Sequence, residues 1–354
     1  MRILVDMGHP GHVHFYKHAI WRLQKKGHQV LVSARDKDVT LALLDHYGFP
    51  YRTLSAIGGG RWGLLREFLQ REWALLRLIR EFNPDVVTEI GGLFIAPVCR
   101  LLGKPSIVFT DSEPVPLDRY FTYPFASVIC TPDCFMRDLG KRHIRYAGYH
   151  ELAYLHPSYF QPDPTVLDEL GVSEGEPFIV LRFVAWKASH DLGQEGFSLS
   201  FKREVVKTLS RYGKVFITSE AELPTEFESF RIHVPPHRIH DVLAFAWLYM
   251  GEGATMATEA GLLGTPSVYV SSLVGTMGNF EELKDRYQLV YSYRDPAEAL
   301  RQAVQLLEQG DVKAEWRRRR ERLLAEKIDV TLFVVERIER SIIPQDRRRS
   351  AHGD

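Results

Sequence analysis

Short apolar runs alternate with longer segments of helical periodicity along most of the chain. The first run is Ile3, Leu4 and Val5, and a loop of glycines and histidines and then a helical segment at 13–26 follow it. This alternation is typical of βα units, whose parallel strands are buried between helices on both faces of a sheet. The sequence therefore predicts an α/β protein built on parallel sheets.

The predicted elements form two sets, separated by an irregular stretch rich in Pro and Tyr at 146–164. Strands of the first set are predicted at 3–5, 29–33, 86–90, 106–110 and 128–130, and its helices at 13–26, 39–47, 62–82 and 93–102. Strands of the second set are predicted at 178–183, 214–218, 248–250 and 267–270, and its helices at 201–212, 237–245, 255–263 and 297–309. A long charged helix at 313–340, with a break near Asp329, follows them.

The length of the chain, 354 residues, exceeds the usual size of a single domain. We therefore expect two Rossmann-like domains, an N-terminal one at 1–157 and a C-terminal one at 165–330. The segment 331–344 is more apolar than an exposed tail needs, so we expect it to pack back on the N-terminal domain and complete it. The polar tail at 345–354 is expected to be disordered.

The charge and cysteine content exclude several classes of protein. Lys plus Arg and Asp plus Glu both number 45, which offers no general attraction to nucleic acid, so we expect no such partner. Cys99, Cys130 and Cys134 lack the second pair of ligands that a zinc site needs, and they do not suggest a disulfide framework. The chain shows no signal-peptide pattern and no apolar run near the roughly 20 residues that span a bilayer. The expected location is the cytoplasm.

The loop at 8–12, after the first predicted strand, contains two glycines and two histidines. Glycines let a backbone approach a ligand closely, and the start of the following helix attracts anions. A histidine here can accept a proton near neutral pH. We take His12 as a candidate base and Gly8 and Gly11 as candidate ligand-binding residues. Secondary candidates are His9 and His14. The alternative is a tight turn with incidentally exposed histidines, since the spacing is not that of a dinucleotide fingerprint.

The segment 251–266 carries the strongest motif of the sequence. Small residues follow a predicted strand and open a helix, so the amide groups of the first helical turn are open to phosphate oxygens. Gly253, Ala254 and Thr255 are the candidate residues there. Glu259 lies one helical turn after Thr255, and its carboxylate can accept two hydrogen bonds from a ribose diol. The alternative is a well-capped βα unit with Glu259 as a solvated helix residue.

This segment resembles the donor-nucleotide motif of GT-B glycosyltransferases and of non-hydrolysing UDP-GlcNAc 2-epimerases. The loop at 8–12 is similar to the glycine-rich loop of the GlcNAc transferase that makes peptidoglycan lipid intermediates. Over nearly its whole length, including 149–157, the chain resembles a prokaryotic family of predicted glycosyltransferases. The resemblance implies a GT-B fold, with two Rossmann-like domains facing each other across a cleft and a C-terminal helix packing back on the first. It also implies a nucleoside diphosphate sugar, UDP-linked, as the ligand of the C-terminal domain.

Two further groups are expected at the cleft. Arg182, at the end of the first strand of the second set, would stabilise the charge that develops on a departing diphosphate. Secondary candidates in the same loop are Lys187 and His190, whose alternative is ordinary loop polarity. Asp111 follows a strand and would orient an acceptor hydroxyl, assist a histidine, or cap the next segment. Glu113 is a secondary candidate beside it.

We interpret the chain as an enzyme, a metal-independent glycosyltransferase that needs no cofactor and moves a sugar to an unknown acceptor in cell-surface polysaccharide or lipid-linked glycan synthesis. One alternative is an epimerase or hydrolase acting on the same donor. The sequence departs from the epimerase pattern because Gly91 and Gly92 stand where those enzymes place an acidic residue. Another alternative is a nucleotide-sugar-binding protein without turnover. The oligomeric state stays open.

The helix at 61–82 mixes arginines with apolar residues that lie off its main apolar stripe. Such a helix can dock on anionic lipid, which would suit a lipid-linked acceptor. It can equally be a core helix whose arginine stems cover apolar flanks. The sequence keeps both interpretations, so peripheral membrane contact is an open expectation.

Overall fold

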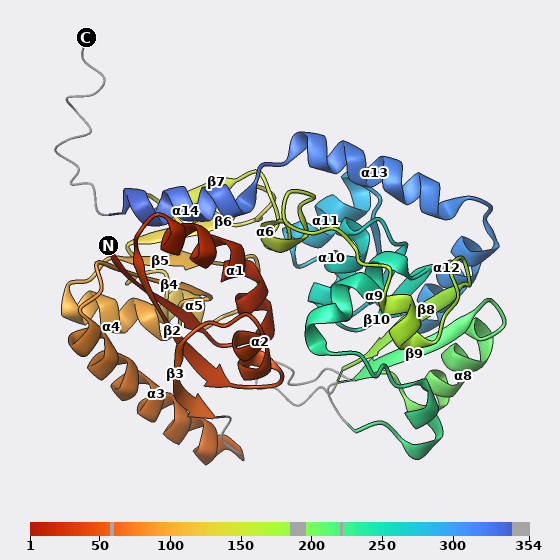
Figure 1. Ribbon diagram of the computed structural model, residues 1–354, viewed down its shortest axis with the longest axis horizontal. Helices are drawn as coiled ribbons and strands as arrows, with labels where there is room; N and C mark the ends of the chain where they lie inside the picture. The colour runs from red at the N-terminus through yellow and green to blue at the C-terminus, as the bar shows by residue number, and fades with distance from the viewer. Residues whose placement is uncertain (57–59, 185–195, 220–221, 342–354) are drawn as a thin grey trace, which may run out of the picture. The chain divides into compact units, whose positions relative to one another are not determined.

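The computed structural model describes residues 1–56, 60–184, 196–219 and 222–341, and its chain forms two compact units (Figure 1). Unit 1 comprises Met1–Tyr154 and Ile328–Asp354, and unit 2 comprises Leu155–Lys327. Unit 2 is thus inserted in the sequence of unit 1. The sequence placed the first boundary at 157 and the return at 331, a few residues after the divisions found here.

Unit 1 is built on a seven-stranded sheet of order β3-β2-β1-β4-β5-β6-β7. All of its strand pairs are parallel. Its strands are β1 (Arg2–Met7), β2 (Gln29–Asp36), β3 (Tyr51–Ala56), β4 (Val86–Ile90), β5 (Ser106–Phe109), β6 (Val128–Pro132) and β7 (His143–Tyr146). Its helices are α1 (Pro10–Lys25), α2 (Thr40–His46), α3 (Gly60–Phe82), α4 (Ile95–Leu102), α5 (Asp118–Phe121), α6 (Leu152–Leu155, which crosses into unit 2) and α14 (Val330–Arg340).

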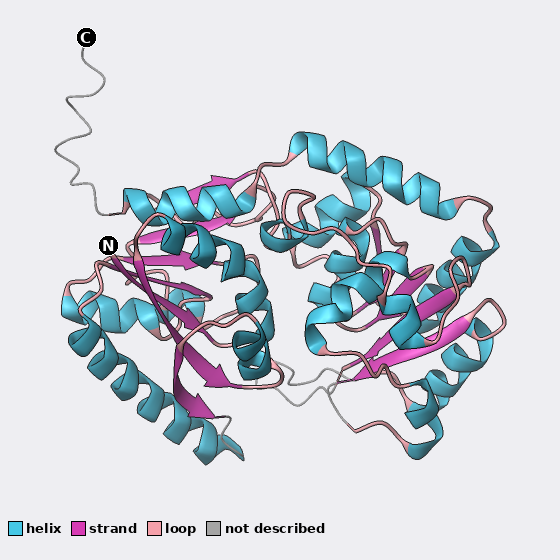
Figure 2. Ribbon diagram, viewed as in Figure 1, coloured by secondary structure: helices cyan, strands magenta, loops and turns pink. Residues whose placement is uncertain are grey.

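Helices cover both faces of this sheet, as Figure 2 shows. On one face, Leu75 and Ile79 of α3 and residues of α4 pack with Leu4 and Val108, and all four named side chains are fully buried. On the other face, Phe15 of α1 lies 5.2 Å from Phe109, ring centroid to ring centroid. Because side chains alternate along a strand, Val108 and Phe109 serve opposite faces of the sheet.

The C-terminal helix α14 packs on unit 1, as the sequence predicts. Asp329 caps the helix by accepting a hydrogen bond from the amide of Leu332. The hydroxyl of Thr331 donates to the carbonyl of Ala153 at 2.6 Å, and Phe333 lies 4.8 Å from the ring of Tyr146. This helix therefore belongs to the core of unit 1.

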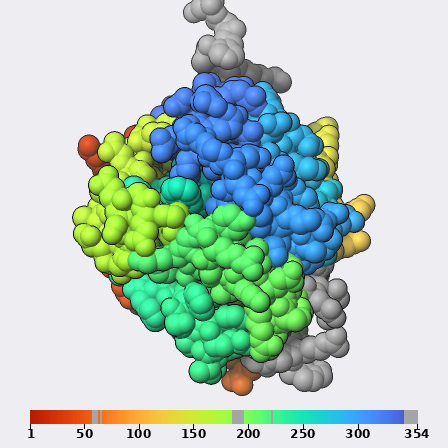
Figure 3. All heavy atoms as spheres, turned by 90° about the vertical axis from the view of Figure 1, so that its right-hand side faces the viewer, coloured from red at the N-terminus to blue at the C-terminus, as the bar shows by residue number. Residues whose placement is uncertain are grey.

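Unit 2 is built on a five-stranded parallel sheet of order β12-β11-β10-β8-β9. Its strands are β8 (Phe178–Phe183), β9 (Lys214–Ser219), β10 (Leu248–Gly251), β11 (Ser267–Val270) and β12 (Val290–Tyr293). Its helices are α7 (Val166–Leu170), α8 (Leu199–Leu209), α9 (Ile239–Phe245), α10 (Ala254–Leu262), α11 (Gly278–Glu281), α12 (Pro296–Glu308), α13 (Val312–Glu326), the 3-10 turns η1 (Thr225–Phe230) and η2 (Pro236–Arg238), and the π-helical turn η3 (Glu282–Arg286). On one face of this unit α8 and α12 lie side by side, green and blue in Figure 3.

The predicted α/β architecture on parallel sheets is confirmed in both units. Three strands, β3, β7 and β12, were not predicted, and all three lie at the edge of a sheet. None of the helices in the described part of the chain is both long and apolar enough to cross a membrane.

Candidate functional site

The loop at 8–12 leads into α1, and two histidines of this loop accept hydrogen bonds from its amides. His9 is the N-cap residue, and its Nδ1 accepts a hydrogen bond from the amide of Gly11 at 3.1 Å. Nδ1 of His12 accepts from the amide of Gly8 at 3.2 Å. The amides of both candidate glycines therefore already have acceptors within the turn. A phosphate oxygen could reach them only after a histidine ring has moved away.

His12 is half-buried, and its pKa lies well below the usual value, mainly because of burial and then because of nearby His9 and Arg71. The ring is therefore neutral at pH 7. Since its Nδ1 accepts a hydrogen bond from the amide of Gly8, its own ring proton lies on Nε2. In this tautomer Nε2 of His12 donates a hydrogen bond rather than accepting a proton. The role of His12 as base remains a prediction.

His14 lies one turn into α1, and its side chain is buried, away from the loop. Its ring centroid lies 5.4 Å from that of Tyr154 and 6.2 Å from that of Tyr47. This packing describes an aromatic cluster on the inner side of α1. It gives His14 a structural environment distinct from those of His9 and His12.

A buried cluster of charges lies beside the same loop and was not recognised from the sequence. Nη2 of Arg71 donates to Oδ2 of Asp6 at 2.6 Å, and both side chains are fully buried. Ser33 donates to the other oxygen of Asp6 at 2.6 Å. A Cβ added to Gly8 would lie 3.7 Å from Nη2 of Arg71, which places this ion pair directly under the loop.

Glu89 of β4 adds a second acidic group to this cluster. Its pKa lies well above the usual value, first because of burial and then because of the charge on Asp6. Burial beside Asp6 therefore favours the protonated form of Glu89 more than in water, and its Oε2 accepts a hydrogen bond from the amide of Ile95. Asp6 and Glu89 are the acidic residues near the ends of two largely apolar strands, and this is the signal by which both residues could have been found.

Asp111 follows β5, and its Oδ2 lies 3.4 Å from Nδ1 of His150. Its other oxygen accepts a hydrogen bond from the hydroxyl of Ser112 at 3.1 Å. Glu113 is 2% exposed and accepts from the amide of Met136 at 3.0 Å, so it fastens the loop after β6. Asp111 thus lies beside a histidine, in keeping with one of its predicted roles, although the sequence did not identify His150 as that histidine.

In unit 2, no side chain among the described residues caps the start of α10, and its first turn contains no acidic residue. Gly253 is the N-cap residue, so the first amides of the helix have no acceptor within the helix. A Cβ on Gly253 would lie 2.9 Å from Cγ of Arg182, and one on Gly251 would lie 2.6 Å from the carbonyl oxygen of Arg182. The two glycines therefore allow Arg182 to lie against this helix start.

The guanidinium of Arg182 is oriented by β9, because its Nη1 donates to the hydroxyl of Thr218 at 2.8 Å. Ala254 is half-buried at the helix start and Thr255 is exposed. The structure thus brings Arg182, Gly253, Ala254 and Thr255 together within one unit. A cation beside the first amides of a helix is an arrangement that binds anions.

Glu259 lies deeper in α10 and is buried, with 5% of its surface exposed. Its Oε1 lies 3.0 Å from Nε2 of His240 on α9. His240 was not recognised from the sequence, because the two residues meet only through the packing of α9 on α10. The carboxylate of Glu259 is therefore held by a partner, whereas Thr255 on the same helix is in contact with solvent.

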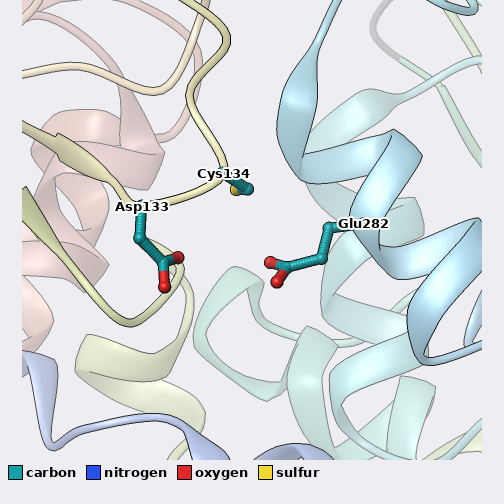
Figure 4. A group of neighbouring side chains, drawn as sticks. All are labelled: Asp133, Cys134 and Glu282. Carbon is teal, nitrogen blue, oxygen red and sulfur yellow. The ribbon is translucent and has the colours of Figure 1, made fainter.

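Two of the secondary candidates, Lys187 and His190, lie outside the described residues. Figure 4 draws Asp133 and Cys134, which follow β6 in unit 1, and Glu282, which opens η3 in unit 2. Within unit 2, the carboxylate of Glu282 accepts hydrogen bonds from Nζ of Lys327 at 2.9 and 3.0 Å. Among the described residues, neither unit by itself gathers three such metal-ligating side chains, and we assign no metal site to this group.

A model of the family described as "Protein of unknown function (DUF354)" matches residues 1–339. The uncharacterized protein MJ0665 of Methanocaldococcus jannaschii is 25% identical over 286 residues, which cover 77% of this chain and 83% of that protein. The UDP-GlcNAc 2-epimerase of Neisseria meningitidis, solved bound to UDP-GlcNAc, matches with a TM-score of 0.70 at 12% identity and covers 96% of this chain and 100% of its own. The Streptomyces sp. SF2575 glycosyltransferase SsfS6, solved with thymidine diphosphate, matches with a TM-score of 0.60 at 17% identity, over 95% and 99%. The predicted GT-B fold type is confirmed by these structures.

Proposed function

The chain belongs to the DUF354 family, and on this premise we propose that it is a glycosyltransferase that moves a sugar from a nucleoside diphosphate sugar to an acceptor hydroxyl. The donor is UDP-linked in this proposal, and the acceptor belongs to cell-surface polysaccharide or lipid-linked glycan synthesis. The solved structures that carry thymidine diphosphate or UDP-GlcNAc support the choice of a nucleoside diphosphate. Unit 2 would bind the donor, and unit 1 would bind the acceptor.

The observation that carries the proposal is the uncapped start of α10 beside Arg182. The amides of Ala254 and Thr255 supply donors for diphosphate oxygens, and the helix dipole adds a partial positive charge. Arg182 supplies a full charge where the leaving diphosphate becomes more negative. The proposal therefore includes neither a metal ion nor a cofactor.

Glu259 is the proposed ribose ligand. Its pairing with His240 at 3.0 Å orients the carboxylate and holds it in one conformation. A carboxylate oxygen that already accepts one hydrogen bond has a second lone pair for another donor. We therefore place the ribose over the inner side of α10, next to α9.

Peripheral membrane contact through α3 is part of the proposal. Leu69 and Trp73 of α3 and Leu101 of α4 are exposed at 61%, 61% and 72%, and they line a common shallow groove. The guanidinium of Arg77 lies 4.4 Å from the ring of Trp73. An apolar patch with exposed arginines beside it suits the surface of an anionic membrane, where a lipid-linked acceptor would reside.

Replacement of Arg182 by Ala tests the proposal. Loss of charge-assisted hydrogen bonds of about 1.5–3 kcal/mol should raise the Kd for UDP by roughly 10–150-fold, measured by calorimetry. Arg301→Ala is the matched control, because Arg301 is an exposed arginine on α12 of the same unit. If Arg182→Ala bound UDP as tightly as the parent protein, the proposal that the diphosphate binds at this site would be wrong.

An epimerase acting on the same donor is the second candidate, and the acidic residues Asp6 and Glu89 in unit 1 favour it. The two activities differ in what happens to UDP-GlcNAc. A transferase breaks the bond between the sugar and the diphosphate and releases UDP, with water as a slow acceptor. Exchange of the hydrogen at C2 of the sugar with deuterated water, without release of UDP, would identify an epimerase instead.

A further inference from the structure

His150 occupies the segment between β7 and α6, and its surroundings are those of a held imidazole. Its Nδ1 faces Oδ2 of Asp111 at 3.4 Å. Phe15 of α1 packs on the ring at a centroid distance of 4.8 Å, and the ring of Tyr146 stacks parallel to it within 10° at 6.5 Å. Packing on both sides leaves the ring little freedom to turn.

Nε2 of His150 is a buried polar atom with no hydrogen-bond partner in the part of the chain that the structure describes. The residue as a whole is 7% exposed. Buried polar atoms nearly always have a partner, so an unpaired one indicates a group that binds there. A hydroxyl that donates to Nε2 would satisfy it.

The partners of the two histidines in unit 1 give them opposite tautomers. His12 accepts at Nδ1 from the amide of Gly8, so its proton lies on Nε2. His150 turns Nδ1 toward a carboxylate, which can only accept, so its proton lies on Nδ1. The lone pair of His150 is therefore on Nε2, which is the arrangement that a carboxylate imposes on a histidine base.

We propose that His150, positioned by Asp111, is the residue that takes the proton from the acceptor hydroxyl, and that His12 acts as a hydrogen-bond donor. This inference rests on the proposed glycosyltransferase function. In the step, the acceptor oxygen forms a bond to C1 of the sugar while the bond from C1 to the diphosphate oxygen breaks. The electron pair of that bond leaves with the diphosphate, and the hydroxyl proton moves to Nε2 of His150.

The tautomers can be measured without any activity. We would record long-range proton–nitrogen correlations of the protein labelled with ¹⁵N-histidine, and assign the two rings from His150→Gln and His12→Gln spectra. The expected result is a protonated Nδ1 in His150 and a protonated Nε2 in His12. A protonated Nε2 in His150 would overturn the proposal, because no lone pair would then face the acceptor.

The second test uses release of UDP from UDP-GlcNAc, with water as the acceptor, and UDP affinity from calorimetry. His150→Ala should lower the turnover by about 10²–10⁴-fold and leave the Kd for UDP unchanged, as expected for loss of a general base. Added imidazole should restore part of the turnover, which a purely structural role would not allow. The control is His46→Ala, an exposed histidine of α2, which should behave as the parent protein.

Asp111→Asn tests the positioning role. The variant should lose turnover but gain nothing from imidazole, because its own histidine is still in place with the wrong tautomer. Parent-like turnover in folded His150→Ala or His150→Gln would overturn the proposal. A parent protein that neither binds UDP nor releases it would instead refute the proposed function, and the tautomer measurement would still judge the dyad.

Discussion

In each unit a helix begins after an inner strand, α1 after β1 and α10 after β10. The two helix starts differ in the side chains that lie beside their amides. At α1, Nδ1 of His9 accepts a hydrogen bond from the amide of Gly11, and Nδ1 of His12 accepts one from the amide of Gly8. At α10, Gly253 offers no side chain, and the side chain of Arg182 lies beside it. At α1 the loop amides donate to histidines of the same loop, whereas the first amides of α10 have no side-chain acceptor in the described part of the chain and lie beside a cation.

The difference teaches that a glycine-rich turn before a helix is not by itself an anion site. A helix start binds an anion only if no nearby acceptor already satisfies its amides. Both loops looked alike in sequence, since each combines small residues with the end of a strand. The side chains that decide between them are His9 and His12 in one unit and Arg182 in the other.

The largest expected effect comes from making α10 resemble α1. Gly253→Asp places a carboxylate at the N-cap, where it would bond the first amides and pair with Arg182. We expect UDP affinity to fall on the order of 100-fold or more, because two charge-assisted bonds are replaced, while thermal stability is retained. Calorimetry and thermal unfolding would measure the two quantities.

Gly253→Ala is the control for Gly253→Asp, since its Cβ meets Cγ of Arg182 at the same 2.9 Å without adding a charge. Its effect on UDP binding should be clearly smaller than that of the aspartate. If both variants bound UDP like the parent protein, the contrast between the two helix starts would have no functional meaning.

The next effect concerns pH and the closed helix start. The pKa of His12 in the folded protein lies below its unfolded value, so as pH falls below about 6.5 the unfolded chain binds this proton first. The neutral ring of His12 therefore contributes to the free energy of unfolding above about pH 6.5, and this contribution is lost as the pH falls to the pKa of His12 in the folded protein. His12→Asn should lose about 1 kcal/mol less than the parent protein between pH 7 and pH 5. Denaturant unfolding at both pH values measures this difference, and other buried histidines cancel in the comparison. If the free energy of unfolding changed equally with pH in the two proteins, the lowered pKa of His12 would be refuted.

The smallest effect belongs to the cap itself. His9→Ala removes the acceptor for the amide of Gly11 and should lower the stability of unit 1 by about 0.5–1 kcal/mol. His9→Asn retains an acceptor and should recover part of this loss. UDP affinity should stay unchanged in both variants. A drop in UDP affinity that matches the one for Arg182→Ala would place the nucleotide at α1 instead.

Apolar runs reveal the strands that could be predicted from the sequence, which are the inner strands and β9, an edge strand with the run Val215, Phe216 and Ile217. Ile3, Leu4 and Val5 are fully buried, and their uninterrupted apolar run reveals β1. The strands β3, β7 and β12 lie at sheet edges, where half of the ladder and some side chains meet solvent. Their sequences mix polar with apolar residues, so no apolar run announces them.

The residues of the candidate site also differ in whether their partners are close or distant in sequence. The grouping of Gly253, Ala254 and Thr255 follows from one turn of one helix, and the sequence contains all of that information. The pairing of Glu259 with His240 and that of Asp6 with Arg71 depend on tertiary packing between segments far apart in sequence. Glu113 likewise accepts a hydrogen bond from the amide of Met136, a partner 23 residues away in sequence, and its role at a cleft stays a prediction.

The insertion of unit 2 between Tyr154 and Ile328 has a consequence for the order of events during synthesis. A ribosome must make the whole of Leu155–Lys327 before α14 exists, which takes about 10–35 s at usual elongation rates. During that interval the nascent unit 1 lacks the helix that covers Tyr146 and Phe109. Unit 2 is therefore the first of the two units whose sequence is completely synthesised. The helix α14 thus completes a sheet whose strands were all made before unit 2.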